Sequence, residues 1–359
     1  MKVLVRIMKS SKTREMLKEQ YLNCLKEGRI PWQAGWKKLN LYNGFSNHQY
    51  TGINKMLLQY MSNQRGYEDP RFFTFNQVKD MGLHLNETAK GNGIPIEFWS
   101  LYDKKEKKTI TLGDFERIKA EEPERIPDIK WMVKNYHVFN GIHIEGLPEL
   151  ELTSEIELEE SDHKLFVDTL VNNMGVTLLE KKLNDKAYYV PSEDTVVLPS
   201  YNSFFTDEDY YAVVLHELAH ATGHESRLNR NITNVFGSVE YAKEELRAEI
   251  SSSFVNSELG IVSETVMDNH KAYIQAWIQI IEEQEKELFS AINDAEKIAE
   301  YMEEKGQLEK IVDLYKEVED KKSLPSLKNT VNHTKDKVKT MNKAISEKKI
   351  QKSAVGVER

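Results

Sequence analysis

Two histidines, His216 and His220, stand four residues apart, and Glu217 directly follows the first. On a helix this spacing places both imidazoles on one face, about one turn apart, where two nitrogens can bind a single Zn²⁺ ion. Glu217 would then lie close enough to take a proton from an attacking water as a general base. Residues 216–220 therefore predict the active-site helix of a zinc-dependent metallopeptidase, with one Zn²⁺ per chain.

The third zinc ligand is expected from the next predicted helix, because a catalytic zinc ion usually takes three protein ligands and keeps a fourth position open. Glu245 and Glu249 are spaced i, i+4 in that helix. We expect Glu245 to bind the metal and Glu249 to accept the other N–H of a ligating histidine, which fixes its tautomer. The small side chains of Ala242, Ala248 and Ser252 would let the two helices approach closely.

The sequence leaves alternatives to this ligand set open. Glu244 could replace Glu245, and two surface histidines beside a solvated acidic helix face would show the same spacing. His224 imitates a longer zinc motif, but that motif needs a histidine at position 226, which is Ser226. We therefore expect a glutamate as the third ligand, as in gluzincins, and a loop or supporting role for His224.

Two further roles are expected in this half of the chain. Tyr273 or His270 could stabilise the anion that forms during hydrolysis. The strand expected at residues 195–198, directly before the active-site helix, is the candidate for pairing with an extended peptide substrate.

The elements that position these residues follow from hydrophobic periodicity and end signals. Thr206 with Asp209 three residues later, and Gly223 at the far end, predict a helix over residues 207–222. Other helices are expected at about 11–28, 52–60, 75–81, 163–174, 239–257 and 264–304, with strands at 94–101, 138–144, 187–190 and 195–198. The charge-dense residues 103–134 predict a variable hairpin or insert.

Charge is distributed unevenly along the 359 residues. The net charge is +6 over residues 1–150, −23 over 151–320 and +8 over 321–359. This pattern and the acidic run before residue 163 predict four parts: a DNA-binding domain over 1–148, an acidic linker over 149–162, a metallopeptidase domain over 163–304, and a helical extension with a basic, disordered tail over 305–359. The fold class expected is α+β.

Composition limits where the protein could act. The chain has no apolar run near the ~20 residues that cross a membrane, and no secretory signal. Its single cysteine, Cys24, cannot form an intramolecular disulfide and is expected to be a small core residue. These features predict a cytoplasmic protein without a membrane partner.

The first half of the chain interleaves aromatic residues with cations. Rings that stack on bases and cations that follow phosphates are typical of single-stranded DNA binding, although the same rings could build a core. The residues expected to contact DNA are Trp32, Trp36, Lys37, Lys38, Tyr50, Asn54, Lys55, Arg71, Phe75 and Lys90.

Together these motifs resemble the ArdC-type antirestriction proteins of conjugative plasmids. The carriers in the first half are Pro31-Trp32 with Trp36, Tyr50-x-Gly-Ile-Asn54, Phe73-Thr-Phe75, Pro95-Ile-Glu-Phe-Trp99, Tyr136-x-Val-Phe-Asn140 and Ile144-Glu-Gly-Leu-Pro148. Those in the second half are Tyr188–Pro191, the run from His216 to Arg230, and Tyr241 to Glu249. The chain departs from the family at 88–93, where Lys90 is the one cation of a turn that is usually more basic.

The resemblance implies a small N-terminal α+β domain that binds single-stranded DNA, followed by a zincin-like domain of gluzincin type. It implies protection of incoming DNA during horizontal transfer, with a host protein as a candidate peptidase substrate. Two alternatives stay open: a cytoplasmic zinc metallopeptidase that does not bind DNA, and a zincin domain that has lost catalysis and serves as a binding module.

Overall fold

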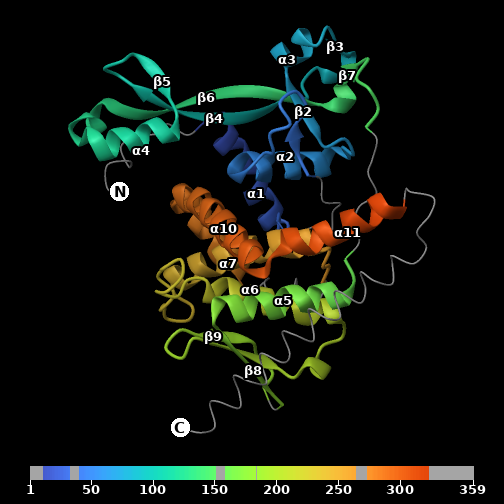
Figure 1. The fold of residues 1–359 in the computed structure, drawn as a ribbon, viewed down its shortest axis with the longest axis vertical. Coiled ribbons are helices and arrows are strands. Elements are labelled where there is room, and N and C mark those ends of the chain that lie inside the picture. Colours follow the sequence, from blue (N-terminus) through green and yellow to red (C-terminus); the bar gives the residue numbers. More distant parts are fainter. Residues whose placement is uncertain (1–10, 33–39, 151–157, 183, 264–272, 323–359) are drawn as a thin grey trace. The chain divides into compact units, whose positions relative to one another are not determined.

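The structure is a computed structural model that describes residues 11–32, 40–150, 158–182, 184–263 and 273–322. Its contacts divide the chain into two compact units, whose elements are labelled in Figure 1. The first unit comprises Met1–Cys24 and Trp36–Glu151, and the second comprises Leu25–Gly35 and Leu152–Arg359. No helix in the described parts of the chain is both long enough and apolar enough to cross a membrane.

A five-stranded sheet organises the first unit, with the strand order β1-β2-β6-β4-β5. The strands are β1 (Tyr42–Asn43), β2 (Arg71–Thr74), β4 (Ile94–Asp103), β5 (Lys108–Ile110) and β6 (Ile129–Asn140). The two long strands β4 and β6 pair antiparallel along the whole of β4 and form the long ribbon visible in Figure 1. A second, two-stranded sheet joins β3 (His84–Leu85) to β7 (Ile144–Glu145).

Four helices accompany this sheet: α1 (Lys12–Lys26), α2 (Gly52–Arg65), α3 (Phe75–Asp80) and α4 (Leu112–Glu121). Threonine caps begin α3 and α4, since the hydroxyl of Thr74 accepts the N–H of Gln77 and that of Thr111 accepts the N–H of Asp114. Ile118 of α4 packs with Leu101 and Ile110 of the sheet. Cys24 is buried, as expected for a small core residue.

The second unit is mainly helical, with α5 (Glu160–Met174), α6 (Asp207–Ala221), α7 (Val239–Leu259), α9 (Ile274–Glu283), α10 (Glu285–Gly306) and α11 (Leu308–Lys322). Its sheet has the order β8-β10-β9, made of β8 (Thr177–Lys181), β10 (Thr195–Pro199) and β9 (Tyr188–Val190). The core joins Val196 of β10, Leu218 of α6 and Ile298 of α10, which are all fully buried. Ile311 of α11 belongs to the same core, so the second unit extends past residue 304.

A short segment early in the chain, Leu25–Gly35, belongs to the second unit. The ring of Trp32 lies 5.3 Å from that of Trp277 on α9, measured between centroids. Lys26 Nζ lies 2.6 Å from a carboxylate oxygen of Glu282 on the same helix. The last residues of α1 and the turn after it therefore pack on α9.

Most predicted elements of the two units are confirmed within a few residues, among them β4, α5, α6 and α7. The single helix predicted over 264–304 is wrong, because Gln284 leaves the helical conformation and separates α9 from α10, while residues 264–272 lie outside the described parts. The insert predicted at 103–134 forms the turn to β5, β5 itself, α4 and the start of β6. The basic tail predicted after α11 also lies outside the described residues.

Candidate metal centre

Helix α6 carries the two histidines and begins where its sequence predicts. The hydroxyl of Thr206 accepts the backbone N–H of Asp209 at 3.0 Å, and acidic residues fill the first turn. Both features stabilise a helix N-terminus. Ala219 on α6 and Ala248 on α7 are fully buried, which allows the two packed helices to bring their polar side chains together.

Three ligand atoms converge between α6 and α7. The Nε2 atoms of His216 and His220 are 3.2 Å apart. The carboxylate of Glu245 lies 3.6 Å from His216 Nε2 and 3.5 Å from His220 Nε2. Atoms bound about 2.1 Å from a tetrahedral ion would lie about 3.4 Å from one another, so this triangle has the dimensions of a metal site. Within the described residues these three form the one histidine–acid group with such geometry.

The outer nitrogens of both imidazoles face carboxylates. Nδ1 of His216 lies 3.3 Å from Glu249, and Nδ1 of His220 lies 3.5 Å from Glu244. Since a carboxylate only accepts hydrogen bonds, both contacts favour the tautomer that is protonated at Nδ1. Both Nε2 lone pairs then point toward the Glu245 carboxylate, and this convergence of acceptors fits a cation.

The structure therefore separates the roles of three neighbouring glutamates. Glu245 lies with the ligand atoms, and Glu249 lies beside His216, where the sequence analysis expected each of them. Glu244 points to the outer side of His220 and accepts a hydrogen bond of 2.7 Å from Arg230. Arg230 ends the motif that begins at His216, but its contact with Glu244 was not predicted, because that contact depends on how the loop before α7 folds.

Burial determines the electrostatics of this cluster. Burial raises the pKa of the Glu217 carboxyl and outweighs the neighbouring imidazoles, which lower it. Although burial opposes it, attraction to His220 and hydrogen bonds from both histidines hold the pKa of Glu245 far below its usual range. Four buried glutamates (Glu217, Glu244, Glu245 and Glu249) thus surround two imidazoles, and a divalent cation would offset their excess negative charge.

The wall of the site contributes a strand and two tyrosines. The backbone N–H of Tyr189 in β9 hydrogen-bonds Glu217. Tyr241, one turn before Glu245 on α7, hydrogen-bonds that carboxylate, and its hydroxyl lies 3.4 Å from that of Tyr273. Tyr273 is thus near the ligand atoms, whereas the alternative anion-stabilising residue, His270, lies outside the described residues.

Arg227 fastens β9 to the end of α6. Its side chain donates hydrogen bonds to Asp194 in the β9–β10 turn, to the hydroxyl of Tyr189 and to the backbone oxygen of Ala221. The same carboxylate also accepts a hydrogen bond of 2.7 Å from Tyr189. Because Tyr189 bonds Glu217 through its backbone, this network holds the strand at the candidate base. His224 lies in the adjoining loop, where its Nδ1 is 2.8 Å from the hydroxyl of Ser226.

The prediction that residues 195–198 pair with a substrate is wrong. They form β10, which pairs with β8 along its whole length and with β9 over Thr195–Val197, so it is the central strand of its sheet. The strand at the edge next to Glu217 is β9. Periodicity alone does not distinguish an edge strand from a central one, because that distinction requires the strand order.

Several residues that were predicted to contact DNA instead pack or form hydrogen bonds within the protein. Tyr50 is 8% exposed and packs edge-on against Phe72, so no ring face is open to a base and this prediction is wrong. Trp32 packs on Trp277 in the second unit. Asn54 hydrogen-bonds both backbone groups of Glu97, which closes the free edge of β4.

The other predicted DNA contacts differ in exposure. Phe75 is 59% exposed at the start of α3, Lys90 is exposed, and Lys55 is partly buried. Trp36, Lys37 and Lys38 lie outside the described residues. Phe98 and Tyr136, which are 56% and 39% exposed, were not among the predicted contacts.

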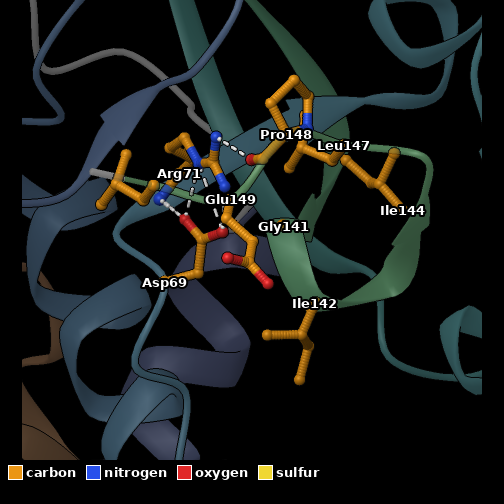
Figure 2. A pocket seen from close by; sticks show the side chains of 9 residues that line it. Asp69, Arg71, Gly141, Ile142, Ile144, Leu147, Pro148 and Glu149 are labelled. Atoms are coloured by element: carbon orange, nitrogen blue, oxygen red, sulfur yellow. Dashed lines mark hydrogen bonds and ion pairs between the residues drawn. The ribbon is translucent and has the colours of Figure 1, made fainter. Parts of the chain in front are cut away.

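Arg71 lies in the wall of a pocket of about 420 Å³ in the first unit, shown in Figure 2. Its guanidinium is paired with Asp69 at 2.7 Å and donates a hydrogen bond to the backbone oxygen of Pro148. Gly141 is required beside this pair, because a Cβ there would come within 2.2 Å of Asp69. Arg71 therefore joins β2 to the end of the first unit, and its charge is already paired.

Comparisons with known families and structures bear on both halves of the chain. Residues 11–139 match the family model for the N-terminal domain of anti-restriction factor ArdC. Residues 166–294 match that for a zincin-like metallopeptidase. Crystal structures of the antirestriction protein ArdC from plasmid R388, one metal-free and one bound to Mn(II), are similar in fold, each with a TM-score of 0.63. The metal-free structure is 23% identical in sequence, and the match covers 83% of this chain and 98% of that one. The Mn(II)-bound structure is 24% identical, and the match covers 82% of this chain and 97% of that one.

Curated relatives share part of their length with this chain. Two Escherichia coli proteins named DNA primase TraC are 34% identical over 301 residues, which is 80% of this chain. The chain spans 20% and 27% of their lengths, so most of each primase has no counterpart here. An uncharacterized protein of Sinorhizobium fredii, y4eC, is 28% identical over 277 residues, which is 76% of this chain and 84% of y4eC.

Proposed function

We propose that this chain is an antirestriction-type protein that binds single-stranded DNA and hydrolyses peptide bonds with one bound Zn²⁺. The proposal starts from its pairing of an ArdC-type N-terminal domain with a zincin-like metallopeptidase domain. The observation that carries the hydrolytic part is the triangle of His216 Nε2, His220 Nε2 and a Glu245 carboxylate oxygen. Two nitrogens and one oxygen are a donor set that suits zinc.

The residues around the triangle suit the hydrolysis of an amide. A divalent cation held there would supply a Lewis acid that polarises the scissile carbonyl and acidifies a water. Glu217 accepts the proton of the attacking water and later donates one to the leaving amine, a role that its raised pKa favours. Glu249 and Glu244 hold the imidazoles in the orientation that binds metal. Tyr273, whose hydroxyl lies 3.4 Å from that of Tyr241, would donate a hydrogen bond to the oxyanion.

A peptide substrate would extend the sheet at β9. Among the residues that the structure describes, β9 pairs with β10 on one side only, and it lies beside Glu217, so an added strand would bring a scissile bond near the candidate base. Arg227 and Asp194 would keep β9 in register during this pairing.

The test of the hydrolytic part compares wild type with Glu217→Gln and Glu245→Ala. Glu217→Gln should keep one zinc per chain and lose about 100- to 10,000-fold in peptide cleavage, because it removes the proton acceptor. Glu245→Ala should lose the metal itself, as measured by elemental analysis of purified protein. Zinc-loaded wild type that cleaves no member of a quenched peptide library would overturn the peptidase proposal and favour the alternative of a silent binding module.

The DNA-binding part is supported by the first unit. Its sequence matches the N-terminal domain of an anti-restriction factor, and residues 1–150 carry a net charge of +6. Phe75, Lys55 and Lys90 stay proposed contacts, and so do Trp36, Lys37 and Lys38. Fluorescence anisotropy with single- and double-stranded oligonucleotides at two salt concentrations tests this part. Equal affinity for both forms would overturn the preference for single strands, and no binding to either form would favour the alternative of a cytoplasmic metallopeptidase without a DNA role.

The two activities together would protect incoming DNA during transfer. One candidate route is cleavage of a host defence protein in the cytoplasm. If Glu217→Gln still protects DNA from restriction in a transfer assay, protection depends on binding and not on hydrolysis.

A further inference from the structure

The two long strands of the first unit expose a row of aromatic and basic side chains on one face. Residues opposite one another in a ladder point to the same side of a sheet, and side chains alternate along each strand. In the β4–β6 ladder Phe98 pairs with Lys134, and Tyr102 pairs with Lys130. Tyr136, two residues after Lys134, belongs to the same face. We call these five residues the aromatic–lysine face.

Measured contacts confirm that these side chains share a face. The rings of Phe98 and Tyr136 meet edge to face, with 6.3 Å between their centroids. The Nζ atom of Lys130 lies 5.7 Å from the centroid of the Tyr102 ring. Phe98 is 56% and Tyr136 39% exposed, and both lysines are exposed. The rings therefore keep surface that a flat ligand could cover.

The charge of this face is positive. The carboxylates of β4 lie on the opposite side of the ladder, where Glu97 pairs with Arg14 and Asp103 with Arg125. Within the described part of the chain, neither lysine of the face lies within ion-pair distance of a carboxylate. A ligand that brings its own negative charge would therefore meet no acidic side chain from these two strands.

On the opposite side of the β4–β6 ladder, helix α4 packs against the strands. Leu101 of β4 is 3% exposed and packs with Ile110, Ile118, Phe115 and Ile129, so α4 covers that side. The aromatic–lysine face is thus the side of the ribbon that α4 does not cover.

We propose that the aromatic–lysine face is where the first unit binds single-stranded nucleic acid, an inference that rests on the DNA-binding part of the proposed function. The rings would stack on unpaired bases, while Lys134 opposite Phe98 and Lys130 opposite Tyr102 contact phosphates. Phe98 and Tyr102 lie four residues apart, about 13 Å along the strand, so the face offers two such pairs along one single strand of nucleic acid. A duplex hides its base faces and would lose the stacking contribution.

The test measures binding of a fluorescein-labelled oligodeoxythymidine of about 16 nucleotides to the full chain. Tyr136→Ala and Phe98→Ala should each weaken binding about 5- to 150-fold, the loss expected for one stacked base. The matched control is Trp131→Ala, since Trp131 is also 39% exposed on β6 but lies on the opposite face. This control should bind like wild type.

The lysines give a second, independent readout. The double variant Lys130→Gln/Lys134→Gln should reduce the slope of log K against log salt concentration by about 1.4, because two phosphate contacts to a single strand are lost. Ultraviolet crosslinking of the oligonucleotide to wild type, with peptide mapping, should place adducts in residues 98–102 or 130–136 and does not depend on how a variant folds.

The outcomes separate this inference from the function on which it rests. Wild type that fails to bind the oligonucleotide would overturn both. Wild type that binds, with the Tyr136, Phe98 and lysine variants unchanged and crosslinks elsewhere, would overturn the face alone. Crosslinks that lie only in the second unit would also overturn it.

Discussion

Replacement of Glu249 by alanine should weaken zinc binding although Glu249 is not a proposed ligand. Its carboxylate is 1% exposed and lies 3.3 Å from Nδ1 of His216. Without it the imidazole can rotate or take the other tautomer, and the Nδ1–H is left in a site that water hardly reaches.

The expected loss in affinity is about 10- to 100-fold, or about 1.4 to 2.7 kcal/mol. An unpaired buried N–H costs about 1 to 3 kcal/mol by itself, which agrees with this range. Loss of Glu245 should exceed it, because a ligand is then removed from the ion.

The assay titrates metal-free protein with Zn²⁺ in competition with a fluorescent chelator of known affinity. Glu240→Ala is the control, since Glu240 is on the same helix but its side chain is 60% exposed and pairs with Lys243 at 2.8 Å. This control should leave zinc affinity within about two-fold of wild type. If Glu249→Ala binds zinc as wild type does while Glu245→Ala does not, the argument that Glu249 orients His216 is refuted.

The further predictions concern stability. Gly44→Ala should destabilise the first unit by about 1 to 3 kcal/mol in urea, because its Cβ would lie 2.1 Å from the buried ring of Phe73. Gly113→Ala, which meets only an ordinary contact at 3.7 Å in α4, should instead stabilise by about 0.5 to 1 kcal/mol. Burial would raise the pKa of Glu97, but hydrogen bonds from Arg14 outweigh it and lower that pKa. The stability that Glu97 adds is therefore complete above the unfolded pKa of about 4.3, and it is lost as pH falls through the lower pKa of the folded state. Wild type should thus lose its advantage over Glu97→Gln in urea melts carried out well below pH 4.3. Removal of metal with a chelator should lower the melting temperature of the zincin-like domain, and added zinc should restore it.

Different results would contradict each of these. Equal urea midpoints for wild type and Gly44→Ala would mean that the Phe73 ring moves aside freely. An advantage over Glu97→Gln that does not change with pH would remove the role of the ion pair. A melting temperature that does not respond to zinc would show that the metal triangle does not bind the ion in solution.

The metal cluster was largely predictable because its information is local. The spacing of His216 and His220 defines one helix face, and that of Glu245 and Glu249 defines another. The burial of both stripes brings the faces together, and the end signals at Thr206 place the first helix correctly.

The DNA-binding residues were harder to predict because aromatic side chains serve cores and ligands equally well. Tyr50 and Phe98 look alike in sequence, yet one ring is buried and the other is exposed. The difference depends on the register of β4 with β6 and on which side α4 covers. Arg71 illustrates the same limit, since its charge is paired with Asp69, which lies two residues away in the irregular segment before β2, and the sequence pattern does not specify the conformation of that segment.

The position of Leu25–Gly35 in the second unit affects how the protein can be dissected. A fragment that starts after the acidic residues 149–162 would lack Trp32 and Lys26, and the indole of Trp277, now fully buried, would lose its neighbour. The complementary front fragment would contain Trp32 but not Trp277, so the ring of Trp32 would lose its packing partner. The truncated peptidase half should therefore fold best when a synthetic peptide spanning residues 25–35 is added to it, since this peptide supplies the missing segment of the second unit.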